Sequence, residues 1–396
     1  MEMEVAAPAA AGFVHCEGGP APRRLLRARR EFLPTAVTAN NFTKGVRVSP
    51  DGLCVLCASD DRALRLFEVD EAAGDEDAAS VLQFREGGAV YDFAWYPFMT
   101  SADPNSCIFL TTSRDQPVHM WDAYTGKLRA TYRAFDHLDE LAAANSVAFN
   151  ATGDKIFAGF DRMVRFFDIA QPSRDFCSRA TSKTRRSRQG QRGIISSLHF
   201  NPDHSKIYAA GSYGGSTCIY TEDEGEELLA LHDHDGKGIT QVRFSPCGRL
   251  LFTASRRDAR IHCWDIRNST QIVQTFHRIG DTNQRIEFDL HCGGRYLATG
   301  SRDGKVMLFD VVTGELVDEQ IRLPDCANGV SFFPDASRAM VAVSSGQRHY
   351  DLPDDMRDED DESGIGGTTS PNNRNALEVY EFSGSRVEAE AVAAPA

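Results

Sequence analysis

Arginine recurs in short polar segments along the chain, and this spacing is the first pattern with a chemical meaning. Most of these segments also contain an aspartate, and each follows a run in which apolar residues predominate. A guanidinium group attracts phosphate, so arginines gathered on one surface would form a site for a polyanion. The arginines of this series are Arg62, Arg114, Arg162, Arg256, Arg257, Arg302 and Arg348.

More cationic residues precede or begin other apolar runs, and aromatic and amide residues lie close to them. A basic surface that also carries aromatic residues favours the binding of a single-stranded or looped RNA. A base stacked on an aromatic ring contributes about 1–3 kcal/mol to the binding free energy. The alternative is that each arginine pairs with the aspartate beside it, and both interpretations stay open. The additional cations are Lys44, Arg192, Lys237 and Arg285, and the candidate stacking or edge-reading residues are Tyr91, Tyr213, Asn283 and Gln284.

Catalytic motifs are absent from the sequence. It contains no glycine-rich phosphate loop, no GxSxG and no HExxH. Cys54 and Cys57 form a CxxC pair inside a strand-like run, without the second pair that a metal site requires. We therefore predict a protein that is not an enzyme and uses no cofactor.

Histidines in LHDHDGKG could in principle bind a metal together with the neighbouring aspartates. We favour a structural role, because His232 and His234 lie in a polar loop between two apolar runs. His137 lies in a similar loop earlier in the chain. We predict no metal site and assign structural roles to His137, His232, Trp121 and Trp264.

Composition limits the class of protein and its partners. The chain has 396 residues, 41% of them hydrophobic and 9% aromatic, as in a folded globular protein. A formal net charge of −14 excludes nucleic-acid binding over the whole surface but allows a local basic patch. The N-terminus resembles no signal peptide, and no apolar run reaches the roughly 18 residues of a membrane span. We expect a soluble, intracellular protein with reduced cysteines.

An internal repeat predicts the architecture. Each copy has short alternating strands separated by turns and ends on an aromatic residue, usually followed by an acid. The spacing matches the roughly 40–50 residues of a four-stranded propeller blade. The copies span residues 45–68, 90–122, 146–168, 194–220, 239–265, 285–310 and 329–382, and their closing aromatic residues are Phe67, Trp121, Phe167, Tyr220, Trp264, Phe309 and Tyr380. The sequence therefore predicts an all-β fold with a single seven-bladed WD-repeat β-propeller.

Stacking the blades radially buries the apolar faces that a lone four-stranded sheet would expose. The same arrangement brings all turns between second and third strands to one face, so the arginine series gathers there. Acids in these turns suit tight turns in which a carboxylate accepts backbone N–H bonds; they are Asp61, Asp115, Asp161, Asp258 and Asp303. The fourth repeat has SYGGST instead, so a looser turn is expected there. Ring closure needs an outer strand for the last blade, and EFLPTAVTAN (31–40) is the candidate.

Several segments fall outside the repeats. We predict a disordered leader over residues 1–30 that ends in RRLLRARR, a propeller over residues 31–382 and a disordered tail over residues 383–396. Residues 70–80 form an acidic loop, and residues 350–375 form an acidic insert in the last blade that we expect to be mobile. The basic loop 172–193 could bind phosphates, act as a nuclear-import signal, or carry charge only for solubility.

Specific strings make this sequence similar to a known family. Residues 91–160 and the segments GIISSLHFNP (193–202), SRRDARIHCWDIRN (255–268), TNQRIEFD (282–289), CANGVSFFP (326–334) and SSGQRH (344–349) resemble the telomerase Cajal body protein family. The similarity extends over nearly all of residues 40–382. Within the strings shared with the family, the resemblance implies functional roles for Phe42, Lys44, His232, Arg256 and Arg285. Of these, Phe42 and His232 are expected to support the ring.

This resemblance implies a nuclear RNA-binding subunit. Such a protein recognises the Cajal-body box of small Cajal-body RNAs and telomerase RNA, which also carry box H/ACA ribonucleoprotein proteins, and directs them to Cajal bodies. It would fold in the cytoplasm with the cytosolic chaperonin. The short leader, Val48 in place of a frequent tryptophan, and the acidic insert depart from the family's pattern. The alternative function is a protein-only WD-repeat scaffold for assembling nuclear complexes.

Overall fold

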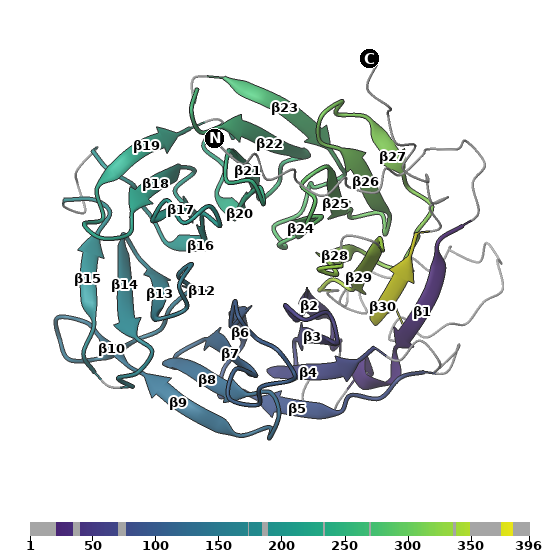
Figure 1. Cartoon of the computed structure of the whole chain (residues 1–396), viewed down its shortest axis with the longest axis horizontal. Coiled ribbons are helices and arrows are strands. Elements are labelled where there is room, and N and C mark those ends of the chain that lie inside the picture. The colour runs from purple at the N-terminus through teal and green to yellow at the C-terminus, as the bar shows by residue number, and fades with distance from the viewer. Residues whose placement is uncertain are drawn as a thin grey trace, which may run out of the picture.

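Antiparallel sheets arranged around a central axis make up the protein (Figure 1). The computed structural model describes residues 21–34, 40–69, 77–172, 174–183, 189–232, 234–268, 271–335, 338–348 and 374–382. These residues form seven four-stranded sheets, one two-stranded hairpin and one short 3-10 helix. The predicted seven-bladed, all-β WD-repeat propeller is therefore confirmed. Among the described residues, no helix has the length and apolar character needed to cross a membrane.

The first four blades follow one another along the chain, each built from its inner strand outwards. Blade one consists of β2 (Thr43–Val48), β3 (Cys54–Ser59), β4 (Ala63–Glu68) and β5 (Leu82–Arg85). Blade two consists of β6 (Val90–Trp95), β7 (Ile108–Ser113), β8 (Val118–Asp122) and β9 (Leu128–Tyr132). Blade three consists of β12 (Ser146–Phe149), β13 (Lys155–Phe160), β14 (Met163–Asp168) and β15 (Cys177–Ala180). Blade four consists of β16 (Ile195–Phe200), β17 (Ile207–Ser212), β18 (Thr217–Thr221) and β19 (Glu227–Leu231).

Two further blades repeat this order, and the last one combines both ends of the described chain. Blade five consists of β20 (Ile239–Phe244), β21 (Leu250–Ser255), β22 (Arg260–Asp265) and β23 (Ile272–His277). Blade six consists of β24 (Phe288–Leu290), β25 (Tyr296–Gly300), β26 (Val306–Asp310) and β27 (Leu316–Asp318). Blade seven consists of β28 (Ala327–Phe332), β29 (Met340–Ser345), β30 (Ala376–Glu381) and β1 (Arg23–Ala28). The small hairpin pairs β10 (Ala134–Phe135) with β11 (Leu141–Ala142).

Burial along the strands follows their distance from the axis. Every residue of β7 and of β29 is buried, because these second strands are covered on both faces by neighbouring blades. The outer strand β23 is only partly buried, with Val273 exposed. Apolar clusters join adjacent blades, as where Leu110 of blade two packs with Ile156 of blade three. The core is therefore a ring of contacts between sheets, and it holds the connecting turns in fixed positions.

The ring closes with a strand that the sequence pattern did not predict. The predicted outer strand over 31–40 is wrong: β1 pairs with β30 in antiparallel register, from Arg23 opposite Glu381 to Ala28 opposite Leu377 (Figure 1). The expected disorder of RRLLRARR and the propeller boundary at residue 31 are corrected accordingly. A bulge between Arg24 and Leu26 interrupts the alternation, so Leu25 and Leu26 are both buried.

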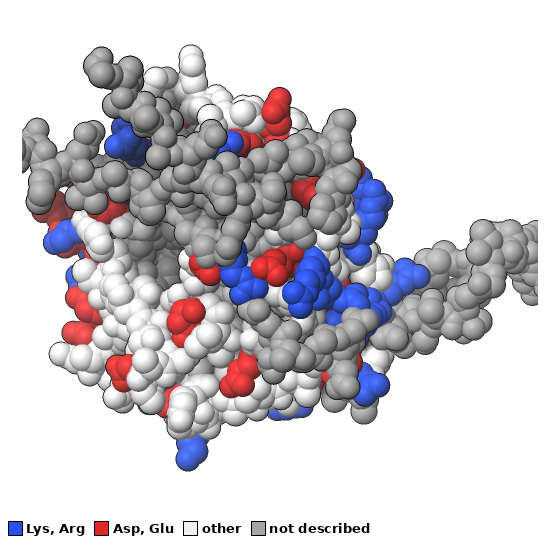
Figure 2. Space-filling view, turned by 45° about the vertical axis from the view of Figure 1, so that its right-hand side comes forward, with Lys and Arg blue, Asp and Glu red and all other residues white. Residues whose placement is uncertain are grey.

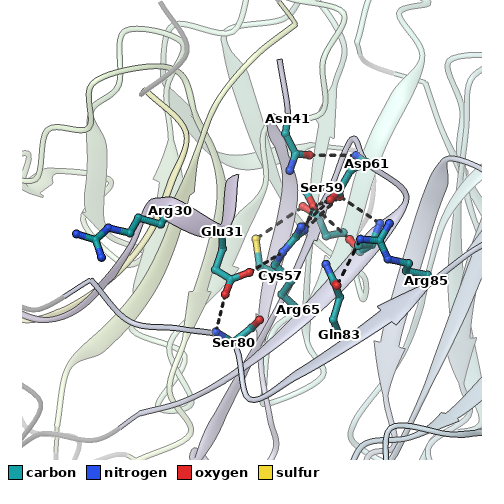
Figure 3. Close-up of polar contacts among 12 residues, drawn as sticks. Arg30, Glu31, Asn41, Cys57, Ser59, Asp61, Arg65, Ser80, Gln83 and Arg85 are labelled. Atoms are coloured by element: carbon teal, nitrogen blue, oxygen red, sulfur yellow. Dashed lines mark hydrogen bonds and ion pairs between the residues drawn. The ribbon is translucent and has the colours of Figure 1, made fainter. Parts of the chain in front are cut away.

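Beyond β1, the 3-10 helix η1 (Arg30–Phe32) ties the closing segment to blade one. Glu31 Oε2 accepts a hydrogen bond from the Nε of the buried Arg65 at 3.1 Å, and its other oxygen accepts from the Ser80 amide at 3.1 Å. Arg65 also pairs with Asp61 in the turn of blade one, while Arg30 points away from this network (Figure 3). The side chain of Asp77, in the predicted acidic loop, accepts from the amides of Arg29 and Arg30.

In several turns between second and third strands, an aspartate accepts a backbone N–H bond, as predicted. The side chains of Asp61, Asp258 and Asp303 each accept a backbone N–H from the residue two positions later. The expected loose turn in blade four is wrong, because Ser212 at the end of β17 holds the turn: its Oγ accepts the Gly214 amide at 3.0 Å. A Cβ on Gly215 would come within 2.6 Å of the Gly236 carbonyl oxygen, so this turn packs tightly against the next loop.

Some predicted segments lie wholly or partly outside the described residues. These are residues 1–20 of the leader, residues 70–76 of the acidic loop, residues 350–373 of the acidic insert and residues 383–396 of the tail.

Candidate nucleic-acid interface

All connections between second and third strands reach one face of the ring, together with the loops that join one blade to the next. This follows because the inner strands of all blades run in the same direction and every sheet is antiparallel. We call this side the upper face. The opposite side, the lower face, carries the connections between first and second and between third and fourth strands. The arginine series therefore shares the upper face, as the repeat pattern indicates.

Blades seven and one bring two predicted cations together on one carboxylate. Asp60 Oδ1 lies 2.8 Å from Lys44 Nζ, and its Oδ2 lies 3.8 Å from Arg348 Nη2. Lys44 also lies 5.7 Å from the centre of the Phe42 ring. Phe42 is buried, with 7% of its surface exposed, and its carbonyl accepts the Asp60 amide. Phe42 therefore lies beneath this charged group and supports it.

Several other arginines of the series pair with a neighbouring acid. Arg114 Nε lies 3.3 Å from Asp115, and Arg162 Nη2 lies 2.9 Å from Asp161. Arg302 pairs with Asp281, which comes from the loop between blades five and six. These contacts correspond to the local-pairing interpretation. The side of the molecule drawn in Figure 2 likewise shows Lys and Arg interspersed with Asp and Glu.

Arg256 makes a different contact, on an aromatic ring. Its guanidinium carbon lies 4.0 Å from the centre of the Tyr213 ring, and Tyr213 keeps 41% of its surface exposed. Arg257, the next residue, is exposed and donates its backbone N–H to the Thr282 carbonyl at 2.9 Å. Among the described residues, no carboxylate lies within ion-pair distance of Arg256, Arg257 or Arg62. The cations free of acids therefore concentrate around blades four to six, with Arg62 apart on blade one.

Lys237 and a buried histidine meet on the carboxylate of Asp258. Lys237 Nζ lies 3.9 Å from Asp258 Oδ2, and His234 Nδ1 lies 3.2 Å from the same oxygen. His234 Nε2 contacts the Thr253 hydroxyl, which also accepts the Trp264 Nε1–H at 3.0 Å. Burial by itself raises the pKa of Asp258, but hydrogen bonds from Arg260 and His234 hold it well below its ordinary value.

This chain of contacts corrects two of the predicted structural histidines. His234 is buried, whereas His232 is exposed, so His234 performs the role assigned to His232. The residue that structures the blade lies two positions closer to β20, where it faces Asp258. His137 is exposed as well, because β10 and β11 form a projecting hairpin and His137 lies at its tip.

Blade two contains an equivalent network that sequence reasoning missed. Glu86 occupies the place that His234 has in blade five, and it accepts hydrogen bonds from Trp121 Nε1 at 3.0 Å and from Ser113 at 3.0 Å. His119 Nδ1 lies 2.9 Å from the same carboxylate. Burial raises the pKa of Glu86, but hydrogen bonds from His119, Thr111 and Trp121 outweigh burial and lower it overall. In the sequence, Glu86 stands in the string EGG, and nothing in that string indicated this role.

Arg285 lies in the central channel instead of on the exposed rim. Its Nη1 lies 3.4 Å from Asp92 Oδ1, and its Nε lies 3.6 Å from Glu287 Oε1. Burial lowers the pKa of Arg285, but these two carboxylates raise it above its ordinary value overall. The channel has a volume of about 510 Å³ and is lined by inner-strand residues that include Arg47 and Asp92. Arg285 is thus a half-buried cation, paired with carboxylates inside the channel, and is not positioned like the upper-face arginines.

Of the remaining candidate RNA-binding residues on the upper face, two side chains form hydrogen bonds with backbone carbonyls and the others are exposed. Gln284 Nε2 donates to the Gly346 carbonyl at 2.9 Å, and Arg62 Nη1 donates to the Gly87 carbonyl at 3.3 Å. Tyr91 keeps 43% of its surface exposed, and Asn283 and Arg192 are exposed.

The basic loop predicted over residues 172–193 contains the outer strand β15 of blade three, and two of its arginines are held by contacts with neighbouring residues. Arg174 lies 4.1 Å from the centre of the Phe135 ring and pairs with Asp139. Arg179 stacks on Phe166 and donates to the Asp223 carbonyl at 2.7 Å. Residues 184–188, which include three of its arginines, lie outside the described residues.

The CxxC pair lies within a single strand, away from any second pair of cysteines in the described part of the chain. The described residues contain no group of three or more His, Cys, Asp or Glu side chains placed to hold a metal ion. Cys54 and Cys57 both belong to β3, and burial raises the pKa of the Cys54 thiol to about 12. Cys54 is therefore a protonated thiol at neutral pH.

Comparisons with known proteins agree with the repeat pattern and with the resemblance. The family model "WD domain, G-beta repeat" matches residues 225–265 and 274–310. The chain is 40% identical over 357 residues to human Telomerase Cajal body protein 1, covering 87% of this chain and 63% of the relative. The mouse protein of the same name is 39% identical over 353 residues, or 85% and 64% of the two chains. A Drosophila melanogaster homologue is 33% identical over 348 residues, or 82% and 61%. The chain thus spans just under two thirds of the length of these relatives.

Proposed function

Because the chain belongs to the telomerase Cajal body protein family of WD-repeat proteins, we propose that it binds small Cajal-body RNAs and telomerase RNA through its upper face. In this proposal it recognises the Cajal-body box in an RNA loop and directs the ribonucleoprotein to Cajal bodies. It acts as a binding platform and not as an enzyme. Its partners are these RNAs with their box H/ACA proteins, and its place is the nucleus.

One observation carries the RNA assignment: the exposed Tyr213 ring with Arg256 stacked on it, beside the acid-free Arg257. An exposed ring gives a base a surface on which to stack, and guanidinium groups attract the phosphates that flank it. RNA loops expose unstacked bases that can use both contacts, whereas the bases of a duplex are stacked within it. The candidate interface therefore suits a loop element better than a double helix.

Folding assistance by the cytosolic chaperonin is part of the same proposal. Ring closure pairs residues 23–28 with residues 377–381, which lie at opposite ends of the described chain. Such non-local pairing forms slowly and leaves strand edges exposed in the meantime. A chaperonin in the cytoplasm would protect these edges until β1 closes the ring.

A protein-only scaffold is the second candidate, and the local ion pairs favour it. Arg114, Arg162 and Arg302 each have a carboxylate beside them, which weakens their attraction for phosphate. A scaffold would bind proteins on the same face without the steep salt dependence that counterion release gives to RNA binding.

Binding of a labelled hairpin to the full chain distinguishes these candidates. Fluorescence anisotropy would compare an RNA hairpin whose loop carries a Cajal-body box with a matched hairpin whose loop is scrambled. We expect tighter binding of the box hairpin, with log K falling by about 0.7 per neutralised phosphate as log salt rises. Equal, weak binding of both hairpins would reject the RNA assignment and favour the scaffold.

A further inference from the structure

An open pocket of about 550 Å³ lies on the upper face of blade five, beside the connection that leads to blade six. Beside His277, its lining combines four lysine and arginine side chains with two acids: Lys237, Arg257, Arg260, Arg278, Asp258 and Asp281. We call it the blade five–six pocket. The sequence pattern did not indicate it, because Arg260 and Arg278 lie outside the recurring arginine positions.

The acids of the pocket are already engaged by cations. Asp258 Oδ1 lies 2.9 Å from Arg260 Nε, and Asp281 pairs with Arg302 from the adjacent turn. A third carboxylate, Asp235, lies 2.6 Å from Arg260 Nη2. The acids therefore neutralise Arg260 and Arg302, and positive charge remains in excess at the pocket.

The excess charge belongs mainly to Arg257 and Arg278. No carboxylate of the described residues lies within ion-pair distance of either side chain. Lys237 adds to it, since its Nζ lies as far as 3.9 Å from Asp258. A concave site with unneutralised cations attracts an anion more strongly than a flat, paired surface does.

Arg278 gives a second and independent indication that the pocket binds an anion. Only 5% of its surface is exposed, and its Nη1 donates to the Thr299 hydroxyl at 2.6 Å. Its Nε has no hydrogen-bond partner among the described residues. Burial lowers the pKa of Arg278 to about 10, so the group is still protonated at neutral pH. A buried charge without a counterion is unfavourable, and an anion in the adjoining pocket would relieve this.

The pocket adjoins the Tyr213–Arg256 pair. Arg256 directly precedes Arg257, and Lys237 directly precedes Gly238. A Cβ on Gly238 would lie 3.1 Å from the Tyr213 Cα and 3.2 Å from the Arg256 Nε, so this loop packs against both partners of the stack. The aromatic surface and the cationic pocket are therefore neighbours, as a base and its phosphate are in a nucleotide.

We propose that the blade five–six pocket binds a backbone phosphate of RNA while an adjacent base stacks on Tyr213. This inference rests on the proposed RNA-binding function and assigns it a phosphate subsite. A phosphopeptide would fill the pocket equally well but has no base to place on the neighbouring ring. The aromatic surface beside the pocket therefore favours RNA.

The test uses the full chain and the variant Lys237→Ala/Arg257→Ala, which leaves the buried Arg278 intact. Binding of the box hairpin is measured by anisotropy over a series of salt concentrations. We expect weaker binding. We also expect the slope of log K against log salt concentration to be reduced by about 0.7, because one phosphate loses its contacts. The matched control is Lys127→Ala/Lys206→Ala, which removes two exposed lysines of the lower face and should leave the slope unchanged.

A second measurement follows thermal unfolding in inorganic phosphate and in chloride at equal ionic strength. We expect phosphate to raise the unfolding temperature of the wild type and of the control more than that of Lys237→Ala/Arg257→Ala. If the wild type binds the hairpin and the pocket variant keeps the full slope, the pocket assignment is wrong and the RNA function stands. If no hairpin binds but a phosphoserine peptide does, and the pocket variant loses the peptide, both the RNA function and the RNA phosphate assignment are wrong.

Discussion

The guanidinium carbon of Arg256 lies 4.0 Å from the centre of the Tyr213 ring, although the two residues come from adjacent blades. Tyr213 belongs to the turn of blade four that lacks an acid, and Arg256 belongs to the corresponding turn of blade five. Because no carboxylate separates them, the cation and the ring form one continuous surface on the upper face.

Removing the ring of Tyr213 should weaken RNA binding without unfolding the protein. Tyr213→Ala should reduce affinity for the box hairpin by about 5- to 150-fold, the equivalent of about 1–3 kcal/mol for one stacked base. Tyr213→Phe keeps the ring and should retain most of the affinity. Anisotropy measures both variants, and equal loss in Tyr213→Phe would show that stacking is not the source of the effect.

Reversing two charges of the upper face should abolish RNA binding. Arg256→Glu/Arg302→Glu adds negative charge where we place the phosphates. Arg302 is exposed and Arg256 is half-buried without a carboxylate partner, so thermal unfolding should stay close to that of the wild type. The matched control Lys127→Glu/Lys206→Glu changes the net charge equally on the lower face. Loss of binding in both double variants would indicate a nonspecific effect of net charge.

The structural histidine of blade five can be identified by a pair of substitutions. His234→Ala leaves the buried Asp258 and Thr253 with fewer partners and should lower the free energy of unfolding by about 1–3 kcal/mol. His232→Ala, at an exposed position, should change it by less than about 0.5 kcal/mol. Denaturant unfolding of both variants tests this, and a larger effect at His232 would contradict the network described here.

Acid should destabilise blade two through Glu86. Hydrogen bonds hold the folded-state pKa of Glu86 below its ordinary value of 4.5. A carboxyl with a lowered pKa contributes its stability above that ordinary value and loses it as the pH falls through the folded-state pKa. The free energy of unfolding should therefore decline from about pH 5 to about pH 3, and Glu86→Gln should flatten part of this decline. An unchanged pH profile in Glu86→Gln would rule out this contribution.

Ring closure by β1 should be essential. A chain lacking residues 1–20 keeps β1 and should unfold like the full chain. A chain lacking residues 1–28 loses the buried Leu25 and Leu26 and exposes the edge of β30, so we expect aggregation or a clearly lower unfolding temperature. Equal stability of the two truncations would mean that β1 is dispensable.

The sequence was sufficient to predict the fold because the repeat is local. Each blade carries its own alternation and closing aromatic residue, such as Trp121 or Trp264, and a repeat of that length has few ways to bury its apolar faces. The gathering of the arginines on one face followed from the same topology. These features need no knowledge of distant contacts.

The closing strand and the charge partners could not be predicted in this way. RRLLRA has no alternation because a bulge buries two successive leucines, so its pattern resembles a charged leader. Asp60 and Asp281 reach Arg348 and Arg302 from other loops, which only the folded ring brings close. The position of the loop was also not enough to identify the structural histidine of blade five. His232 was predicted, but the buried partner of Asp258 lies two residues further on, at His234. The placement of the candidate RNA contacts thus depends on non-local geometry.

Ultraviolet crosslinking of the tagged protein in its own cells, followed by sequencing of the attached RNA, tests the central claim most directly. We expect enrichment of small nuclear RNAs that share a terminal-loop motif, with the crosslinks lost in Arg256→Glu/Arg302→Glu. Recovery of background RNA alone, at equal levels for the wild type and this variant, would contradict RNA recognition by the upper face and assign the propeller to protein scaffolding.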